Sequence, residues 1–104
     1  MKSLNVNELK EMIDNKEDYQ LIDVRELHEF ENANIQGILI PMGEVPARYE
    51  EISKDKKVII HCRSGARSAN AISFLEQNFG YTNLYNLEGG IIAWANEIDD
   101  SLII

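Results

Sequence analysis

Val58-Ile59-Ile60-His61-Cys62-Arg63-Ser64-Gly65-Ala66-Arg67-Ser68 is the stretch that decides the fold, because it joins a strand, a tight loop and a helix. Its first three residues are all β-branched, which fits a central parallel strand buried on both faces. From Ala66 to Phe79, apolar residues recur at steps of three and four, which predicts a long helix that ends at Gly80. Cys62 is therefore expected at the carboxyl end of a strand, where parallel sheets bind ligands.

Strand and helix patterns alternate along the rest of the chain, which predicts an α/β fold. The capping-box spacing of Asn5 and Glu8 marks the start of a first helix over about residues 6–14. The other expected elements are strands at about 19–24, 38–40 and 84–87 and helices at about 26–30, 43–52 and 91–97. Together they predict an open parallel sheet flanked by helices on both faces. A chain of 104 residues has room for one core, so we expect one domain over residues 1–104.

Composition and charge exclude several classes of partner. Ten Lys and Arg residues oppose eighteen Asp and Glu, and a net charge of -8 offers no basic face for phosphate groups. No stretch approaches the roughly 20 apolar residues that span a bilayer, and the first residues contain no apolar run of signal-peptide length. We therefore expect no nucleic-acid partner, no membrane partner and a cytoplasmic location.

Cys62 is the single cysteine, so it forms no internal disulfide and no multi-cysteine metal site. It is either a small buried hydrophobic residue or a thiol kept for its reactivity. The loop favours reactivity, because Gly65 can take a positive φ that turns backbone N–H groups inward as an anion-binding nest. With the N-terminus of the following helix and the guanidinium groups of Arg63 and Arg67, this nest predicts a lowered Cys62 pKa and a nucleophilic thiolate.

A thiolate in such a nest can attack a sulfane sulfur and retain it as a persulfide, whose terminal anion the same amides stabilise. We expect Arg63 to guide an anionic donor into the site. Arg67, on the first turn of the helix, is expected to brace the loop through contacts to carbonyls or carboxylates. Ser64, Gly65 and Ala66 complete the expected donor-binding loop.

The loop Cys62-Arg63-Ser64-Gly65-Ala66-Arg67-Ser68 resembles the active-site loop of the rhodanese family. Two more motifs resemble that family's first and last signatures: Leu21-Ile22-Asp23-Val24-Arg25-Glu26 with Glu29-Phe30 and Ile35-Gln36-Gly37, and Leu87-Glu88-Gly89-Gly90 with Trp94. The resemblance implies a five-stranded parallel sheet between helices, and a sulfurtransferase with a persulfide on Cys62 and thiosulfate or other persulfides as donors. It implies no metal and no organic cofactor. The chain departs from the family at residues 33–37, where Ala-Asn-Ile-Gln-Gly replaces the common Gly-His-Ile-Pro-Gly, a change that affects loop geometry more than chemistry.

Three functions stay open. The first is a sulfurtransferase that passes sulfur from a small anionic donor to cyanide or a thiol, with a protein as a possible sulfur acceptor. The second is a phosphatase or arsenate reductase, but the related enzymes place five residues between Cys and Arg, whereas four separate Cys62 from Arg67. The third is a sulfur-relay or regulatory module that docks on a protein, which the acidic composition and the apolar end Leu102-Ile103-Ile104 leave open.

Other polar residues have structural interpretations. Neighbouring strand side chains point to opposite faces, so the side chain of His61 should not meet that of Cys62. His28 lacks metal-binding partners and is expected at the surface. Asp23 and Arg25 are predicted to form a buried or half-buried ion pair that ties a strand end to a neighbouring loop. The aromatic residues predicted to pack in the core are Trp94, Phe74 and Phe79.

Overall fold

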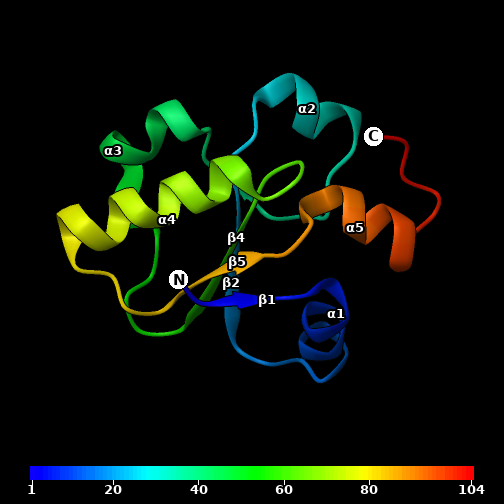
Figure 1. Cartoon of the computed structure of the whole chain (residues 1–104), viewed down its shortest axis with the longest axis horizontal. Helices are drawn as coiled ribbons and strands as arrows, with labels where there is room; N and C mark the ends of the chain where they lie inside the picture. Colours follow the sequence, from blue (N-terminus) through cyan, green and yellow to red (C-terminus); the bar gives the residue numbers. More distant parts are fainter.

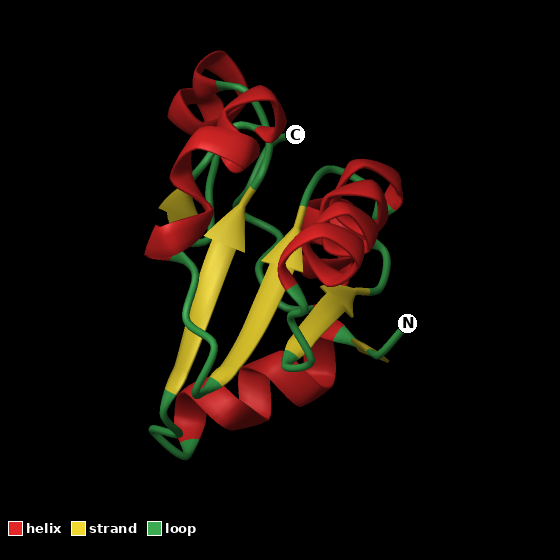
Figure 2. Ribbon diagram, turned by 90° about the vertical axis from the view of Figure 1, so that its left-hand side faces the viewer, coloured by secondary structure: helices red, strands yellow, loops and turns green.

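A computed structural model describes residues 1–104 and contains a parallel sheet with helices packed on both of its sides (Figure 1, Figure 2). The strands are β1 (Ser3–Leu4), β2 (Tyr19–Asp23), β3 (Ile38–Leu39), β4 (Lys57–His61) and β5 (Leu84–Leu87). They form one five-stranded sheet in the order β1-β5-β4-β2-β3, and every neighbouring pair is parallel. β4 lies in the centre, as its run of β-branched residues predicts, and the α/β fold with a five-stranded parallel sheet is confirmed.

Five α-helices and two short 3-10 helices lie between and after the strands. They are α1 (Val6–Asp14), α2 (Leu27–Asn32), η1 (Met42–Glu44), α3 (Val45–Arg48), η2 (Tyr49–Glu51), α4 (Ala66–Phe79) and α5 (Gly90–Glu97). α1 begins at the predicted capping box, in which the side chain of Asn5 accepts the Glu8 N–H at 2.8 Å and the Glu8 side chain accepts the Asn5 N–H at 2.9 Å. None of these helices has the length and apolar character needed to cross a membrane.

Two elements differ from the sequence-based expectation. The pattern of residues did not predict β1, because two residues are too few to show an alternation; the strand exists because it pairs with β5 through Asn86 and Leu87. The single helix expected at 43–52 is divided into η1, α3 and η2. Pro46 explains the start of α3, since its missing N–H and its ring are tolerated only in the first turn of a helix.

The sheet separates two hydrophobic layers. Successive residues of β4 point to opposite faces, so Ile60 packs in the layer under α3 and α4, and Ile59 packs in the layer with α1 and α5. Cys62 belongs to the first layer and Trp94 to the second. Phe74 and Phe79 are only partly buried and pack at the border of the first layer. The chain therefore leaves β4 with its cysteine already anchored in the core.

Candidate active site

The loop between β4 and α4 folds around the sulfur of Cys62. Cys62 is 1% exposed, and its Sγ accepts the backbone N–H of Gly65 at 3.1 Å. Gly65 has a φ of +114°, a conformation that favours glycine, as the nest interpretation predicts. α4 begins at the next residue, so its first free N–H groups continue the turn of the loop.

A second polar contact reaches the sulfur from α4. Ser68 is fully buried, and its Oγ lies 3.4 Å from Cys62 Sγ. The same oxygen lies 2.6 Å from Asn86 Oδ1 at the end of β5 and 3.2 Å from the carbonyl oxygen of Gly65. The Asn86 amide in turn donates to the Gly65 carbonyl at 3.1 Å. Sequence reasoning gave no role to Ser68 or Asn86, since nothing in a strand residue such as Asn86 signals that it meets a loop.

The environment lowers the pKa of Cys62 from its ordinary value. Burial acts in the opposite direction and raises the pKa, but hydrogen bonds from the Ser68 hydroxyl and from the backbone N–H groups of Ser68, Gly65 and Ser64 outweigh it. The predicted direction is therefore confirmed. The backbone N–H groups lower the pKa as predicted, and the Ser68 hydroxyl adds a donor that the sequence did not predict. The two guanidinium groups, which the prediction also included, are not among the main causes.

Arg67 is held in an ion pair with α2. Its Nη1 and Nη2 donate to the two carboxylate oxygens of Glu29 at 2.7 and 2.9 Å. The hydrogen bond from Arg67 holds the pKa of Glu29 at about 2, well below the ordinary 4.5, and the backbone N–H of Glu26 adds a further hydrogen bond to that carboxylate. Arg67 thus braces the loop through a carboxylate, as its place in the first helical turn predicts.

The remaining loop side chains lie outside the contact network. Arg63, Ser64 and Ala66 are exposed, and the guanidinium group of Arg63 forms no ion pair within the chain. Ser64 and Gly65 act on the sulfur through their backbone N–H groups. Arg63 is consequently the cation of the loop that is free to meet an anion.

The N-terminus of α5 holds the loop from the other side. The N–H groups of Ile91 and Ile92 donate to the carbonyls of Cys62 and Arg63 at 3.0 and 3.2 Å. This approach requires Gly90, whose φ is +57° and where a Cβ atom would lie 2.5 Å from the Cys62 carbonyl oxygen and closer still to that of Arg63. Gly90 therefore permits close contact between the backbone of α5 and that of the loop.

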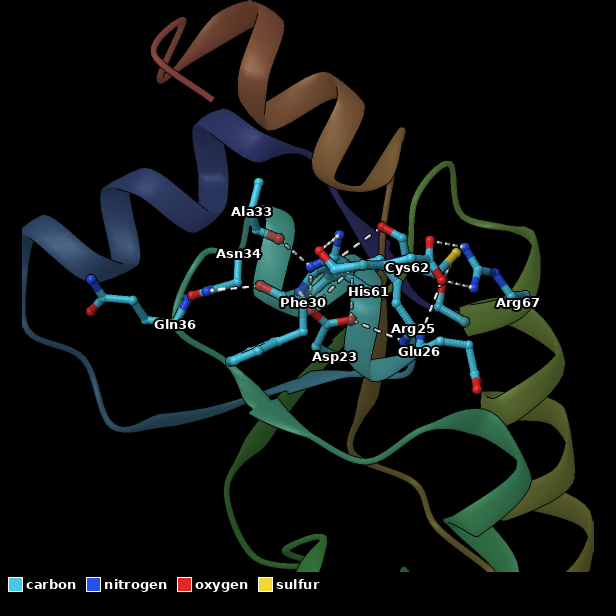
Figure 3. Close-up of polar contacts among 12 residues, drawn as sticks. Asp23, Arg25, Glu26, Phe30, Ala33, Asn34, Gln36, His61, Cys62 and Arg67 are labelled. Atoms are coloured by element: carbon cyan, nitrogen blue, oxygen red, sulfur yellow. Dashed lines mark hydrogen bonds and ion pairs between the residues drawn. The ribbon is translucent and has the colours of Figure 1, made fainter. Parts of the chain in front are cut away.

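Asp23, Arg25 and His61 form a buried polar cluster beside the loop (Figure 3). Arg25 binds Asp23 at 2.7 Å and donates to the carbonyl of Ala33 at 2.7 Å, so the pair ties the end of β2 to the following loop as predicted. His61 Nε2 lies 3.5 Å from Asp23 Oδ2, and His61 Nδ1 lies 3.2 Å from the Cys62 carbonyl oxygen. Burial lowers the pKa of His61, although the charge of Asp23 acts in the opposite direction. The lowered pKa favours the neutral ring. The His61 ring meets the backbone of Cys62 and not its sulfur.

The departure at residues 33–37 changes the path of the backbone. Gln36 has a φ of +68°, and its N–H donates to the Asn34 side chain at 2.9 Å. Proline, which the common family form carries at this position, cannot take a positive φ. This loop therefore differs from the common form in geometry, while the cysteine loop keeps its own contacts.

A cysteine with a lowered pKa, at the end of a central parallel strand and within hydrogen-bond reach of backbone N–H groups, is typical of thiol-dependent transfer sites. The family model of the rhodanese-like domain matches residues 5–97, and the chain belongs to that family. A sulfurtransferase of Allochromatium vinosum is 46% identical over 88 residues, which cover 84% of this chain and 81% of the relative. The thiosulfate sulfurtransferase GlpE of Shewanella oneidensis is 32% identical over 94 residues, 89% of this chain and 91% of the relative.

The fold also matches solved structures. The crystal structure of a rhodanese-like domain protein from Staphylococcus aureus has a TM-score of 0.83 and 34% sequence identity, and the match covers 94% of this chain and 95% of that one. These relatives support a sulfurtransferase.

Proposed function

We propose that this protein moves sulfane sulfur from thiosulfate or a persulfide to a thiol, or to cyanide in an assay, through a persulfide on Cys62. The observation that carries the proposal is the pair of contacts at Cys62 Sγ, the Gly65 N–H at 3.1 Å and the Ser68 hydroxyl at 3.4 Å. Both can donate to an anionic sulfur and so favour the form that acts as a nucleophile.

The first half-reaction loads the enzyme. The Cys62 thiolate attacks the outer sulfur of thiosulfate, a new S–S bond forms, and the bond between that sulfur and the sulfonate breaks with its electron pair leaving on sulfite. In the second half-reaction, cyanide attacks the outer sulfur of the persulfide, and the S–S bond breaks to give thiocyanate and the free thiolate. Charge balances in each step, and one cysteine suffices for the cycle.

The two arginines of the loop have different parts in this cycle. Arg63 is exposed and unpaired, so it can attract the dianionic donor toward the sulfur. Arg67 already binds both carboxylate oxygens of Glu29 and acts by fixing the first turn of α4 against α2. Ser64, Gly65 and Ala66 supply the curved backbone that surrounds the transferred sulfur.

The geometry of the loop gives less support to a phosphatase or an arsenate reductase than to a sulfurtransferase. Only Arg63 to Ala66 lie between Cys62 and Arg67, and Cys62 Sγ already sits 3.1 Å from the Gly65 nitrogen. A tetrahedral oxyanion needs several donors around it at once, whereas Arg67 is occupied by Glu29. A single transferred sulfur atom needs fewer hydrogen-bond donors from the loop than a tetrahedral oxyanion does.

The partners proposed for this cycle are a small anionic sulfur donor and a thiol or cyanide acceptor, with a protein thiol as a possible physiological acceptor. The cycle itself requires no metal or organic cofactor. We also keep the predictions that residues 1–104 act as one domain and that the protein works in the cytoplasm.

Intact-mass measurement after incubation with excess thiosulfate, followed by cyanide, tests the proposal. We expect a gain of one sulfur, about 32 Da, that cyanide removes and that Cys62→Ser abolishes. Ser73→Ala, on α4 and away from the sulfur, is the matched control and should load normally. A protein that gains no sulfur from either thiosulfate or glutathione persulfide would falsify the sulfurtransferase cycle, and phosphate ester or arsenate turnover would then be measured.

A further inference from the structure

The Ser68 hydroxyl has more acceptors around it than it can serve. Its oxygen lies 2.6 Å from Asn86 Oδ1, 3.2 Å from the Gly65 carbonyl oxygen and 3.4 Å from Cys62 Sγ. A hydroxyl group carries one hydrogen and can rotate it among neighbours. The distances favour Asn86 as the acceptor in the resting site, so Asn86 and the sulfur compete for the same proton.

The orientation of the Asn86 amide is fixed by the Gly65 carbonyl. Asn86 Nδ2 donates to that oxygen at 3.1 Å, which leaves Oδ1 facing Ser68. An amide flip would set Oδ1 against a carbonyl oxygen and lose this hydrogen bond. Asn86 therefore presents an acceptor to Ser68, and it is half-buried, so water can reach its side chain if the hydroxyl turns away.

The thiol and the thiolate form of Cys62 favour different positions of the Ser68 hydroxyl hydrogen. While Cys62 is a thiol, its S–H can donate to Ser68 Oγ and the hydroxyl can donate to Asn86, so both groups have partners. After the thiol proton leaves to solvent, an unrotated hydroxyl would turn its lone pairs toward an anionic sulfur. Ser68 is fully buried, so water does not reach the hydroxyl itself to relieve that arrangement.

We propose that the Ser68 hydroxyl turns its single proton from Asn86 Oδ1 to Cys62 Sγ when the thiol ionises, and that Asn86 thereby sets how strongly the site stabilises anionic sulfur. This inference rests on the proposed function, in which Cys62 must become a thiolate before it accepts sulfur. Ser68 touches the reacting atom, while Asn86 is a positioning residue that acts through Ser68. No proton is gained or lost by Ser68, because the hydroxyl only rotates.

The charged groups around the loop do not change in this rotation. They are Arg63 on the loop, Arg67 on α4, and Glu26 and Glu29 at the start of α2. Arg67 and Glu29 are paired with each other. His61, at the end of β4, meets the Cys62 carbonyl rather than the sulfur. The N-terminus of α5 contributes only backbone N–H groups, from Ile91 and Ile92.

A double-mutant cycle on the pKa of Cys62 tests the proposal. The pKa is measured from the pH dependence of iodoacetamide alkylation, with thiolate absorbance near 240 nm as a second readout. The four proteins are the unsubstituted chain, Ser68→Ala, Asn86→Leu and the double variant, with Ser73→Ala as the control on α4. We expect Ser68→Ala to raise the pKa by about one unit, through the lost donor to the thiolate.

The Asn86→Leu variants test whether Asn86 competes with Cys62 Sγ for the Ser68 proton or only holds the loop in place. Asn86→Leu should lower the pKa when Ser68 is present, by about half a unit, because the hydroxyl then has one competitor fewer. It should leave the pKa unchanged in the Ser68→Ala background. An equal shift in both backgrounds, a rise on Asn86→Leu, or no shift on Ser68→Ala would overturn the inference.

The folding of each variant is checked by circular dichroism, and Asn86→Ala replaces Asn86→Leu if the larger side chain prevents folding. The cycle needs no sulfur donor, so its outcome is independent of persulfide loading. Loading without coupling between Ser68 and Asn86 would remove this inference alone. Coupling without loading from any donor would remove the proposed function alone.

Discussion

Arg67 and Glu29 show how one residue pair can order the candidate active site without touching the sulfur. The pair is bidentate, at 2.7 and 2.9 Å, and joins residues 38 positions apart in the sequence. Its carboxylate is about four-fifths buried, which makes the pair stronger than a fully exposed one, although the partly exposed Arg67 keeps water nearby. Its main effect is therefore on the order of the loop and of α2.

The pair predicts a particular dependence of stability on pH. The folded pKa of Glu29 is about 2, below its ordinary value of 4.5, so the pair stabilises the fold above about pH 4.5 and loses this contribution as the pH falls toward 2. Glu29→Gln should lower the free energy of unfolding by about 1–2 kcal/mol at pH 7 and by about half as much at pH 3. Urea denaturation at both pH values measures this, with the exposed Glu50→Gln as control. A loss that is the same at both pH values would contradict the assignment.

At the scale of elements, the cysteine loop is held by three of them. β4 carries Cys62 into the core, α4 supplies Ser68, and the N-terminus of α5 binds the carbonyls of Cys62 and Arg63. The last contact depends on Gly90, since only a residue without a Cβ allows α5 to approach so closely. The position of the sulfur is thus set by how α5 packs on the loop as well as by the loop itself.

Gly90→Ala should separate α5 from the loop. The added methyl group would overlap the carbonyl oxygens of Cys62 and Arg63, and the positive φ adds backbone strain, so we expect a loss of about 3 kcal/mol in stability. Gly43→Ala is the control, because no atom lies within 4 Å of a Cβ atom there. Urea midpoints and Cys62 alkylation rates measure both effects. A Gly90 variant as stable as the Gly43 variant would show that α5 can move without cost.

The whole molecule is two hydrophobic layers on either side of one sheet, with the candidate site at its carboxyl edge. Ile72 on α4 belongs to one layer and Ile59 on β4 to the other, and both are fully buried. Cys62 belongs to the layer of Ile72, so packing under α4 bears more directly on the sulfur than packing under α1. The sheet itself is the wall between the two layers.

This separation predicts additive effects on stability. Ile59→Val and Ile72→Val should each cost about 1 kcal/mol, because each removes one buried methyl group. The double variant should lose the sum within about 0.5 kcal/mol, as expected for sites without shared partners. Urea denaturation of the three variants measures the coupling free energy between the two sites. A coupling well above that limit would mean that packing changes in one layer alter packing in the other. Only Ile72→Val is expected to alter the alkylation rate of Cys62.

Local sequence was sufficient wherever the cause of a structure is local. The β-branched run of β4, the capping box of α1 and the positive φ of Gly65 follow from side-chain shape and turn chemistry within a few residues. The same reasoning placed Cys62 at a strand end and predicted the direction of its pKa. Ser68 lies inside the quoted loop, yet its role was missed because its partner Asn86 is 18 positions away.

The sequence by itself determined the alternation of elements, the central strand, the nucleophile candidate and the bracing role of Arg67. Only the tertiary structure decided which carboxylate binds Arg67, that β1 completes the sheet, that 43–52 is a broken helix, and that Asn86 meets Ser68. The physical reason is that periodicity and turn chemistry act over a few residues. Contacts between distant residues depend instead on how the strands are ordered, and the order β1-β5-β4-β2-β3 is what brings the ends of β4 and β5 together around the sulfur.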